Sequence, residues 1–412
     1  MTETLKPETP DQLRDAVAWA NSDLKPLEVM GRGSKRALGR PVQTAHRLDL
    51  SAFNGISLYE PEELVLSAGA ATPMSDIQAA LEEKGQELSF EPPDYSAVLG
   101  SPRGAGTIGG VLAANLAGPR RIKQGAARDH FLGFEGVSGR GELFKSGGRV
   151  VKNVTGYDLC KLMAGSWGVL AALHTVTVKV LPRGAKTRTL LVFGAEAAAG
   201  VKALAEALNS PCEVSGAAWL PASVAARTGV DMVADPGESV AAVRVEGFGP
   251  SVEYRCEALK RLLAPYGATE ELHSQRSLAF WRAVRDVTPF AAGPNGADER
   301  VIWKVSLPPA DAPAFLAATA GIKGAEAYCD WGGGLVWLAI DAPKTGAEGV
   351  VRDAVAAADS GWAQLFRAPD SLRAAVPVFQ PQGEALDALH RGLKQSFDPN
   401  RVLNPGKMSE GV

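Results

Sequence analysis

The sequence predicts an α+β protein with a glycine-rich first part, a second part of alternating strands and helices, and a short C-terminal segment. Three observations support this prediction. Glycine-rich loops interrupt residues 1–183, strand and amphipathic-helix patterns alternate over residues 184–375, and proline and glycine again punctuate residues 376–412. Repeated strand–helix units of this kind are typical of an open sheet with helices on one face.

The first helix is marked by its capping residues. Thr9 and Gln12 form a T-x-x-Q capping box, and Pro10 fits the first helical position. The spacing of apolar residues predicts a buried stripe at Leu13, Ala16, Val17 and Ala20.

Strands and turns follow in the rest of the first part. The segments "LEVM" (27–30) and "ELVLSAGA" (63–70) are predicted strands. The segment "FLGFEGV" (131–137), with the turn "SGRG" (138–141) after it, predicts a hairpin. Alternating valines in "VTVKVLP" (176–182) predict a half-buried strand.

The second part repeats a strand followed by a helix. The predicted strands are "TRTLLVF", "VAAVRVEGF", "VIWKVSLP" and "GLVWLAID". The helices after the first two strands carry one apolar face each, made of Val201, Leu204 and Leu208 and of Cys256, Leu259 and Leu263.

The composition is that of an ordinary globular protein. The chain has 412 residues, of which 46% are hydrophobic and 22% charged, with a net charge of −3. This length supplies core for roughly two or three domains. The charge balance lacks the basic excess that nucleic-acid binding needs, so we expect no nucleic-acid partner.

The four cysteines are scattered, so we expect neither disulfides nor a metal or iron–sulfur site on them, but small core side chains. They are Cys160, Cys212, Cys256 and Cys329. The N-terminus has no apolar signal segment, and no window approaches the run of about 20 apolar residues that spans a membrane. We therefore expect a cytoplasmic protein, which partners could hold at the inner face of the membrane.

The loop "SPRGAGTIGG" (101–110) raises the question of a nucleotide site. Gly104, Gly106 and Gly109 spell the G-x-G-x-x-G pattern of a Rossmann turn. Such a turn must follow a strand, but the three prolines within residues 92–102 exclude a central strand there. The pattern alone therefore does not predict a Rossmann fold.

We interpret the same loop as an anion site. Residues without a Cβ let backbone N–H groups approach a ligand, and the helix start after the loop carries about half a positive charge. Thr107 adds a hydroxyl. Phosphate or pyrophosphate fits these donors, and a tight turn without a ligand is the alternative. Two further glycine segments, 31–39 and 153–170, favour a long ligand with a diphosphate link.

These segments resemble the PCMH-type FAD-binding flavoproteins, the vanillyl-alcohol oxidase superfamily. The resemblance rests on "GRGSK", "SPRGAGTIGGVLAANLAGPRR", "VVKNVTGYDLCKLMAGSWGVL" and "FDPNRVLNPGK", in this order. Within the superfamily, the chain resembles the FAD-binding subunits of bacterial glycolate oxidases, also in "FWRAVRD", "VIWKVSLP" and "WGGGLVWL".

The resemblance implies a domain organisation. Residues 1–183 are expected to form a PCMH-type FAD-binding domain of two α+β subdomains, and residues 184–375 an α+β cap domain. Residues 376–412 are expected to return to the flavin domain.

The resemblance also implies which residues hold FAD. The first pyrophosphate loop is expected at Gly31, Arg32, Gly33, Ser34 and Lys35, and the second at Gly104, Thr107, Ile108, Gly109 and Gly110. The adenosine or ring pocket is expected at Asp158, Leu159, Gly165, Gly168 and Val169. Further cofactor residues are expected at Gly118 and, near the flavin, at Asn404, Pro405, Gly406 and Lys407.

The chain departs from the family in its histidines. Many relatives carry a flavin-linked histidine in the first loop, where this chain has Lys35 after Ser34, so we expect non-covalent FAD. Relatives that oxidise 2-hydroxy acids have a histidine-rich cap motif. Here no two of the five histidines are spaced as ligands, so we expect no metal site and assign no catalytic residue.

Three features remain open. Trp331 could stack on the flavin or belong to the core, and His390 fits the end of a helix better than a catalytic role. A basic cluster could be a solvated loop, a partner interface or an anion site facing the flavin. It consists of Arg120, Arg121, Lys123 and Arg128.

The resemblance implies a FAD-dependent oxidoreductase that acts on the CH–OH group of 2-hydroxy acids. The chain would be the FAD-binding subunit of a complex that oxidises glycolate to glyoxylate, with a catalytic flavoprotein subunit and an iron–sulfur subunit as partners. A self-sufficient FAD-dependent 2-hydroxyacid dehydrogenase and a binding module with an empty flavin site are the alternatives. The missing cap histidines and cysteine clusters favour the subunit.

Overall fold

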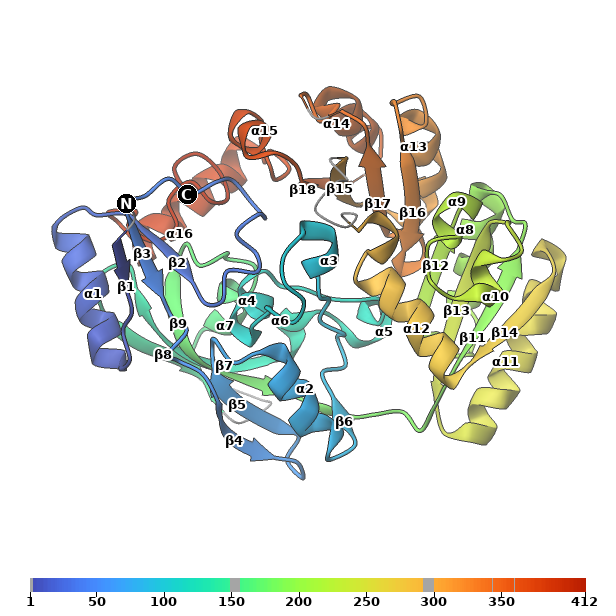
Figure 1. The fold of residues 1–412 in the computed structure, drawn as a ribbon, viewed down its shortest axis with the longest axis horizontal. Coiled ribbons are helices and arrows are strands. Elements are labelled where there is room, and N and C mark those ends of the chain that lie inside the picture. Colours follow the sequence, from blue (N-terminus) through green and yellow to red (C-terminus); the bar gives the residue numbers. More distant parts are fainter. Residues whose placement is uncertain (1–2, 149–155, 292–299, 343, 359) are drawn as a thin grey trace.

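The computed structural model describes residues 3–412 except 149–155, 292–299, 343 and 359. Figure 1 shows two bodies side by side, one formed by the first half of the chain with the C-terminal residues and one by the segment between them. Sheets and helices are mixed in both bodies, so the predicted α+β class is confirmed.

A small parallel sheet lies at the N-terminus, with strand order β1-β3-β2. The strands are β1 (Glu3–Leu5), β2 (Leu27–Met30) and β3 (His46–Asp49), and the helix packed beside them is α1 (Pro10–Ser22). The predicted cap of α1 is confirmed, because the Thr9 hydroxyl accepts a hydrogen bond from the Gln12 N–H at 3.2 Å. Leu13, Val17 and Ala20 are buried as expected, whereas Ala16 is only partly buried.

An antiparallel sheet forms the centre of the first body, with strand order β4-β5-β9-β7-β8. Its strands are β4 (Ile56–Glu60), β5 (Val65–Gly69), β7 (Phe131–Ser138), β8 (Leu143–Gly147) and β9 (Ala171–Lys179). The predicted hairpin is confirmed as β7 and β8. The predicted strand is confirmed at 176–179, with Val176 and Val178 buried, but it begins earlier, at Ala171. Thr177 is buried rather than exposed, because it shares a 2.7 Å hydrogen bond with Ser67.

Short helices and a small strand pair complete the first body. The helices are α2 (Met74–Glu82), α3 (Ser96–Leu99), α4 (Ile108–Ala113), α5 (Arg121–Gln124), α6 (Ala127–His130) and α7 (Leu159–Met163), and the paired strands are β6 (Gln86–Glu87) and β10 (Leu181–Pro182). Ile77 of α2 and Val111 of α4 share one core cluster with Leu66 of β5. This packing brings the start of α4 close to the end of β5.

The second body is built on one eight-stranded antiparallel sheet, ordered β14-β11-β13-β12-β16-β17-β15-β18. Its strands are β11 (Lys186–Phe193), β12 (Gly216–Leu220), β13 (Val240–Gly247), β14 (Thr269–His273), β15 (Val301–Ser306), β16 (Glu326–Asp330), β17 (Leu335–Ile340) and β18 (Trp362–Arg367). All four predicted strands are among them.

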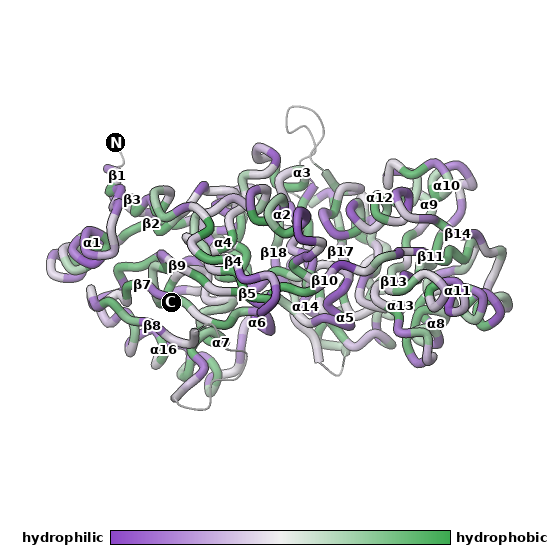
Figure 2. The backbone as a smooth tube through the Cα atoms, turned by 90° about the horizontal axis from the view of Figure 1, so that it is seen from below, coloured by the Kyte–Doolittle hydropathy of each residue, from purple (hydrophilic) through white to green (hydrophobic). Residues whose placement is uncertain are grey.

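Four helices pack on one face of this sheet, but the prediction of helices on one face alone is wrong, because further helices lie on the other face. The four are α8 (Ala197–Leu208), α11 (Gly249–Leu263), α13 (Ala312–Thr319) and α14 (Glu348–Ala356). Strand β15 shows the division of faces, because Val301, Trp303 and Val305 belong to the core under these helices and Ile302 belongs to the core shared with the first body. Figure 2 shows the apolar strands inside and hydrophilic residues along outer helices such as α1.

The other sheet face is covered by α12 and the first body. The helices on this side are α9 (Ala222–Ala225), α10 (Asp231–Ala234) and α12 (Ser274–Arg285). Phe280 and Trp281 of α12 share a core cluster with Phe90 of the first body. The sheet is therefore buried on both faces.

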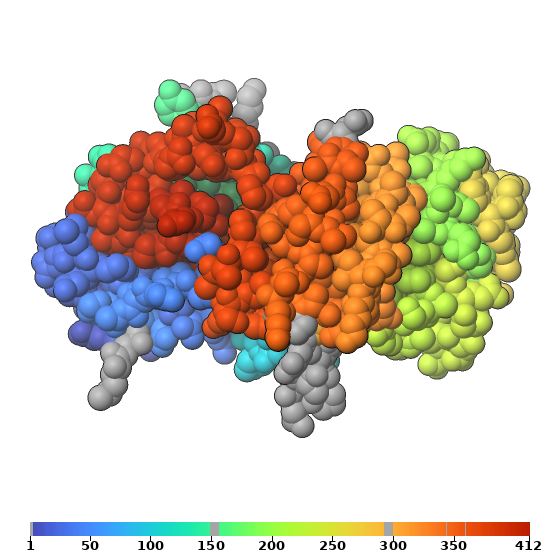
Figure 3. All heavy atoms as spheres, turned by 90° about the horizontal axis from the view of Figure 1, so that it is seen from above, coloured from blue at the N-terminus to red at the C-terminus, as the bar shows by residue number. Residues whose placement is uncertain are grey.

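The C-terminal segment runs back to the small N-terminal sheet. After α15 (Asp370–Ala375) and α16 (Glu384–Phe397), the chain lies beside β2, where the Leu27 N–H donates to Val402 O at 2.7 Å and the Asn404 N–H donates to Leu27 O at 3.0 Å. In Figure 3 the red C-terminal residues lie against the blue N-terminal residues and also reach the orange residues of the second body.

A buried ionic cluster joins the two bodies. Arg244 of β13 is fully buried and lies 2.8 Å from Glu91, while Arg120 lies 2.7 Å from Glu246 of β13 and 2.9 Å from Glu87. We call these five residues the interbody cluster. Two of its ion pairs, Arg244–Glu91 and Arg120–Glu246, cross the contact between the bodies, so loss of either arginine would leave buried carboxylates unpaired there.

Candidate functional site

The loop after β2 presents a row of backbone donors. Within the described chain, the N–H groups of residues 31–35 donate to no protein acceptor. Gly33 lies in the left-handed region with a φ of 75°, which turns the loop sharply. Consecutive unused N–H groups of this kind form an anion-binding concavity.

The second glycine loop uses most of its donors within the fold. The Ile108 N–H donates to Thr72 O at 3.1 Å, the Gly109 N–H to Ala70 O at 2.8 Å, and the Gly110 N–H to the Thr107 hydroxyl at 3.3 Å. Three of the backbone donors that sequence reasoning assigned to an anion are therefore used within the fold. These donors pin the start of α4 to the end of β5 instead.

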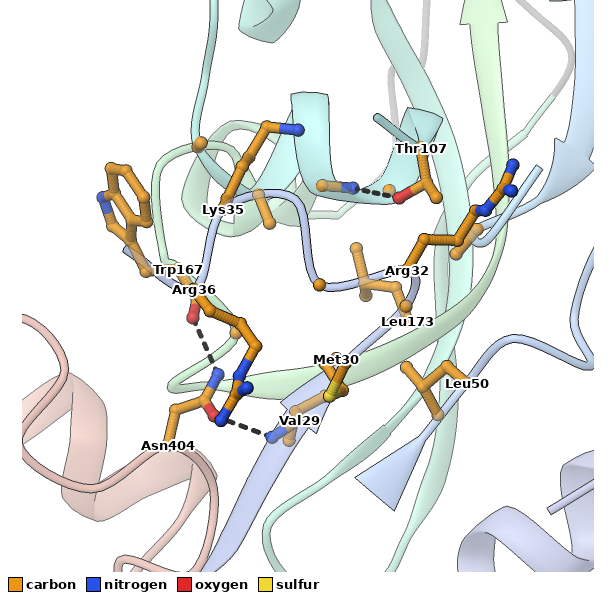
Figure 4. Close-up of a pocket in the computed structure, with 18 of the residues that line it drawn as sticks. Val29, Met30, Arg32, Lys35, Arg36, Leu50, Thr107, Trp167, Leu173 and Asn404 are labelled. Carbon is orange, nitrogen blue, oxygen red and sulfur yellow. Dashed lines mark hydrogen bonds between the residues drawn. The ribbon is translucent and has the colours of Figure 1, made fainter. Parts of the chain in front are cut away.

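A cavity of about 150 Å³ lies between the two loops, β9 and the C-terminal segment. Figure 4 shows Lys35 and Thr107 at one side of it and Asn404 at the other. The structure brings these predicted residues together in its wall: Gly31, Arg32, Gly33, Ser34, Lys35, Thr107, Gly109, Gly110, Gly168, Asn404 and Lys407. We call this space the cofactor cavity.

The other predicted site residues lie elsewhere. Gly104 lines a second cavity and Gly165 a third. Ile108 and Val169 are buried in the core beneath the loops. Asp158 and Leu159 lie at the start of α7 and line none of these three cavities.

Gly118 belongs to the contact between the two bodies. Its carbonyl accepts a 3.0 Å hydrogen bond from the Trp331 indole, and its N–H donates to Phe90 O. A Cβ at this position would lie 2.6 Å from Glu91 O. The glycine is required for close approach of two chain segments, which explains why a glycine motif at this place does not imply a cofactor contact.

Two lysines supply positive charge to the cofactor cavity. Burial lowers the pKa of Lys35 to about 8, and burial, together with Arg373, lowers the pKa of Lys407 to about 8. A Cβ built on Gly110 would lie 3.4 Å from Lys35 Nζ, so this side chain crosses from the first loop to α4. An anion held here replaces the lost hydration of both ammonium groups.

Asn404 ties three segments together at the cavity. Its Oδ1 accepts from the Val29 N–H at 2.7 Å, and its Nδ2 donates to Trp167 O at 3.0 Å, as the dashed lines in Figure 4 show. The backbone of Asn404 has a positive φ of 42°. The C-terminal segment therefore forms one wall of the cofactor cavity, and β2 and the 165–170 loop form others.

Sequence reasoning missed the apolar wall of the cofactor cavity. This wall includes Val29, Met30, Leu50, Trp167 and Leu173. Flat aromatic ligands favour such surfaces, with a few polar groups to orient them. A signal was present in Trp167, an aromatic residue set directly between the glycine positions of a proposed binding segment.

The cofactor cavity adjoins two larger ones. A second cavity of about 390 Å³ shares Ser34 and Lys35 with it, and a third of about 780 Å³ shares Ala114 and Trp167. We call the third one the cap cavity, because strands β15 and β18 of the second body line it. Adjoining cavities of this kind suit a long ligand.

The basic cluster divides between structural and surface roles. Arg120 belongs to the interbody cluster, and Arg121 lies with its guanidinium carbon 4.8 Å from the centre of the Trp331 ring. Lys123 pairs with Glu213, and Arg128 donates to Lys161 O. None of the three sequence interpretations therefore fits Arg120, which contacts carboxylates of both bodies.

Other predictions concern single residues. His390 lies in the middle of α16 rather than at a helix end, so that interpretation is wrong. All four cysteines are buried, as expected. Over the ranges that the structure describes, no three His, Cys, Asp or Glu side chains form a metal site, and no helix is long and apolar enough to cross a membrane.

Two family descriptions match the chain. Residues 3–147 match the family described as "FAD binding domain", and residues 379–408 match "FAD linked oxidases, C-terminal domain". The first match contains both glycine loops, and the second contains Asn404 and Lys407.

Two glycolate oxidase subunits are similar in sequence to this chain, one over nearly its whole length and one over about half of it. The glycolate oxidase subunit GlcE of Escherichia coli strain K12 is 36% identical over 96% of each protein. The glycolate oxidase subunit GlcD of Bacillus subtilis strain 168 is 30% identical over 46% of this chain and 39% of its own length.

Solved structures share the fold. 4-Ethylphenol oxidase from Gulosibacter chungangensis superposes with a TM-score of 0.72 over 98% of this chain and 88% of its own, at 14% identity. Alkyldihydroxyacetonephosphate synthase gives 0.70 over 98% and 77%, at 15% identity. The chain therefore shares its overall fold with both enzymes.

Proposed function

Because the chain belongs to the FAD-linked oxidases, we propose that it is the FAD-binding subunit of a glycolate oxidase complex. The main support is that the backbone N–H groups of residues 31–35, which donate to no acceptor in the described protein, line the same cavity as the Lys35 and Lys407 side chains. Bound FAD would accept the two electrons that leave the CH–OH group of a 2-hydroxy acid.

The residues of the cofactor cavity fit FAD. A diphosphate needs several N–H donors and cations, and residues 31–35 with both lysines supply them. The apolar wall with Trp167 and Leu173 suits the flat rings of the cofactor. In this proposal residues 1–183 hold the cofactor, residues 184–375 cover it, and residues 376–412 return to it.

The proposed FAD is non-covalent. No histidine lines the cofactor cavity in the described part of the chain, and Lys35 stands in the first loop. Acid precipitation of the purified protein should leave the flavin in the supernatant. Flavin retained in the washed pellet would contradict this part of the proposal.

The proposed partners are a catalytic flavoprotein subunit and an iron–sulfur subunit. Two relatives with subunit names support an assembly, and the four buried cysteines offer no cluster ligands for electron transfer onward. We place the complex in the cytoplasm, with membrane contact through its partners.

The test is a flavin count followed by a turnover assay. The purified chain should hold about one FAD per chain and, alone, oxidise glycolate at a negligible rate with an artificial acceptor. Addition of the two partner subunits should restore turnover. A chain that cannot be reconstituted with excess FAD overturns the proposal.

A self-sufficient 2-hydroxyacid dehydrogenase is the second candidate. One observation favours it: four cationic side chains line the cap cavity, and two of them, Lys304 and Arg121, lie near the same tryptophan ring, which sequence reasoning did not identify. Rapid glycolate oxidation by the isolated FAD-loaded chain would establish this candidate in place of the first.

A further inference from the structure

The cap cavity has a charged wall that the cofactor proposal does not use. Strands β15 and β18 contribute Lys304, Ser306 and Gln364 to it, and Arg121 and Trp331 lie at the same cavity. Figure 3 shows a hollow bordered by the red C-terminal residues, which also line this cavity.

Sheet register places the polar residues of this wall next to one another. Lys304 on β15 is directly opposite Gln364 on β18 and Trp337 on β17. Side chains directly opposite in neighbouring strands project from the same face, so these three lie side by side. This is the face away from the four covering helices, because Trp303 and Val305 occupy that other side.

Two cations meet here without a protein anion. In the described structure, neither the Lys304 ammonium nor the Arg121 guanidinium makes a hydrogen bond or an ion pair. Arg121 lies over the Trp331 ring at 4.8 Å, and Lys304 Nζ is 5.7 Å from the centre of the same ring. Burial, and then the charge of Arg121, lowers the pKa of Lys304 to about 8. A desolvated ammonium such as that of Lys304 is costly unless an anion neutralises it, and the exposed Arg121 guanidinium is free to share that anion.

An independent observation also indicates a ligand. Gln364 is only 3% exposed, and its side-chain nitrogen has no hydrogen-bond partner. Buried polar groups are nearly always paired, so an unused amide donor in a cavity wall indicates a missing acceptor.

The acids of the cap cavity do not supply that acceptor. Asp387 and Glu410 line the cavity from the C-terminal segment but form no ion pair with either cation. Asp330 attracts Lys304 but is buried, and its Oδ1 accepts from the Trp331 N–H at 2.7 Å. The cation pair therefore remains available to a ligand.

We propose that the cap cavity binds the carboxylate of a small 2-hydroxy or 2-oxo acid between Lys304 and Arg121, with Gln364 as an additional donor. The choice of this acid class rests on the proposed function. The site itself rests on the unpaired cations and the unused amide. A guanidinium and an ammonium that share one carboxylate supply several charge-assisted hydrogen bonds.

Calorimetric titration of the full chain with glycolate, glyoxylate and inorganic phosphate tests the proposal, with and without FAD. Both acids should bind, and Lys304→Met and Arg121→Gln should each weaken binding roughly 10- to 100-fold, the loss expected for a charged hydrogen bond. Lys304→Arg should retain most of the affinity. Quenching of tryptophan fluorescence by the acid, expected from Trp331, gives a second readout.

Matched controls separate this site from general charge effects. Lys323→Met removes an exposed lysine that pairs with Asp341, and Arg128→Gln removes an exposed arginine outside the cavity. Neither should change acid affinity, and flavin content should be unchanged in every variant.

Three outcomes overturn the proposal: neither acid binds, the Lys304 and Arg121 variants bind like the unaltered chain, or phosphate binds more tightly than both acids. Loss of FAD binding with acid binding intact would instead overturn the proposed function. The two failures are therefore distinguishable.

Discussion

Lys35 and Lys407 make the cofactor cavity sensitive to pH. Both are partly deprotonated near pH 8, because burial lowers the pKa of each to about 8. A bound diphosphate favours the charged ammonium, so FAD affinity should be constant well below pH 8 and fall as the pH rises through it. The limiting slope is about tenfold per pH unit for each lysine.

Flavin fluorescence titrations from about pH 6.5 to about pH 9.5 measure this dependence, since the range spans the two pKa values. Lys35→Met should bind FAD more weakly and with a shallower pH dependence. Equal affinity across the range in the unaltered chain would show that the lysines do not contact the cofactor.

Gly31 and Gly109 form a matched pair for separating binding from folding. A Cβ at Gly31 would lie 3.4 Å from the Thr107 hydroxyl, which is ordinary contact, whereas a Cβ at Gly109 would lie 2.7 Å from Ala70 O. Gly31→Ala should therefore leave the stability of the FAD-free protein unchanged but weaken FAD binding by about tenfold, or about 1.4 kcal/mol.

Gly109→Ala should instead destabilise the FAD-free protein by about 1–3 kcal/mol, the cost of overpacking. Urea unfolding of both FAD-free variants makes the comparison. If Gly109→Ala unfolds like the unaltered chain, α4 can move away from β5 and the close contact is not a constraint.

Helix α16 is attached to the C-terminal segment by a buried ion pair. Lys394 is 1% exposed, and its ammonium donates to Asp398 at 2.8 Å, to Val169 O at 2.7 Å and to Leu403 O at 2.9 Å. The same Asp398 carboxylate accepts from the N–H groups of Val402 and Leu403. The Lys394–Asp398 pair thus holds in place the backbone just before Asn404, which lines the cofactor cavity.

Lys394→Met should leave Asp398 as an unpaired buried charge and destabilise the protein by about 3–5 kcal/mol. It should also weaken FAD binding, because Asn404 loses its support. Chemical denaturation and a flavin titration measure the two effects, with the exposed Lys323→Met as the control. A change below about 1 kcal/mol, typical of surface ion pairs, would contradict the buried role.

The arrangement of the whole molecule depends on the interbody cluster. Arg244 is its only fully buried arginine, and it contacts both Glu91 and Glu246. Arg244→Met removes a positive charge from among three carboxylates, so the contact between the two bodies should loosen. We expect faster proteolysis near residues 183–186, where the chain crosses between the bodies, and a lower melting temperature.

Limited proteolysis followed by mass spectrometry measures this change. Arg276→Met, at an exposed arginine of α12 outside the cluster, should leave the cleavage pattern unchanged. Cleavage of the Arg244 variant at the same rate as the unaltered chain would show that apolar contacts alone hold the bodies together.

Local signals were sufficient for many elements. The cap of α1, the β7–β8 hairpin and the strand–helix units after residue 184 depend on neighbouring residues and on periodicity, which the sequence displays directly. Burial on the second face of a strand was not predictable in this way, because Thr177 is buried through a partner, Ser67, 110 positions away.

The sequence by itself determined the fold class, the glycine loop at residues 31–35 and, through resemblance, the FAD-binding family. Only the tertiary structure decided that the backbone N–H groups of residues 31–35 donate to no acceptor in the described protein, whereas most of those of residues 104–110 do. It also decided that Arg121 and Lys304, 183 positions apart, lie over one tryptophan ring. The physical reason is that a donor's availability and a charge's partners depend on which distant segments pack together, and no local pattern records that packing.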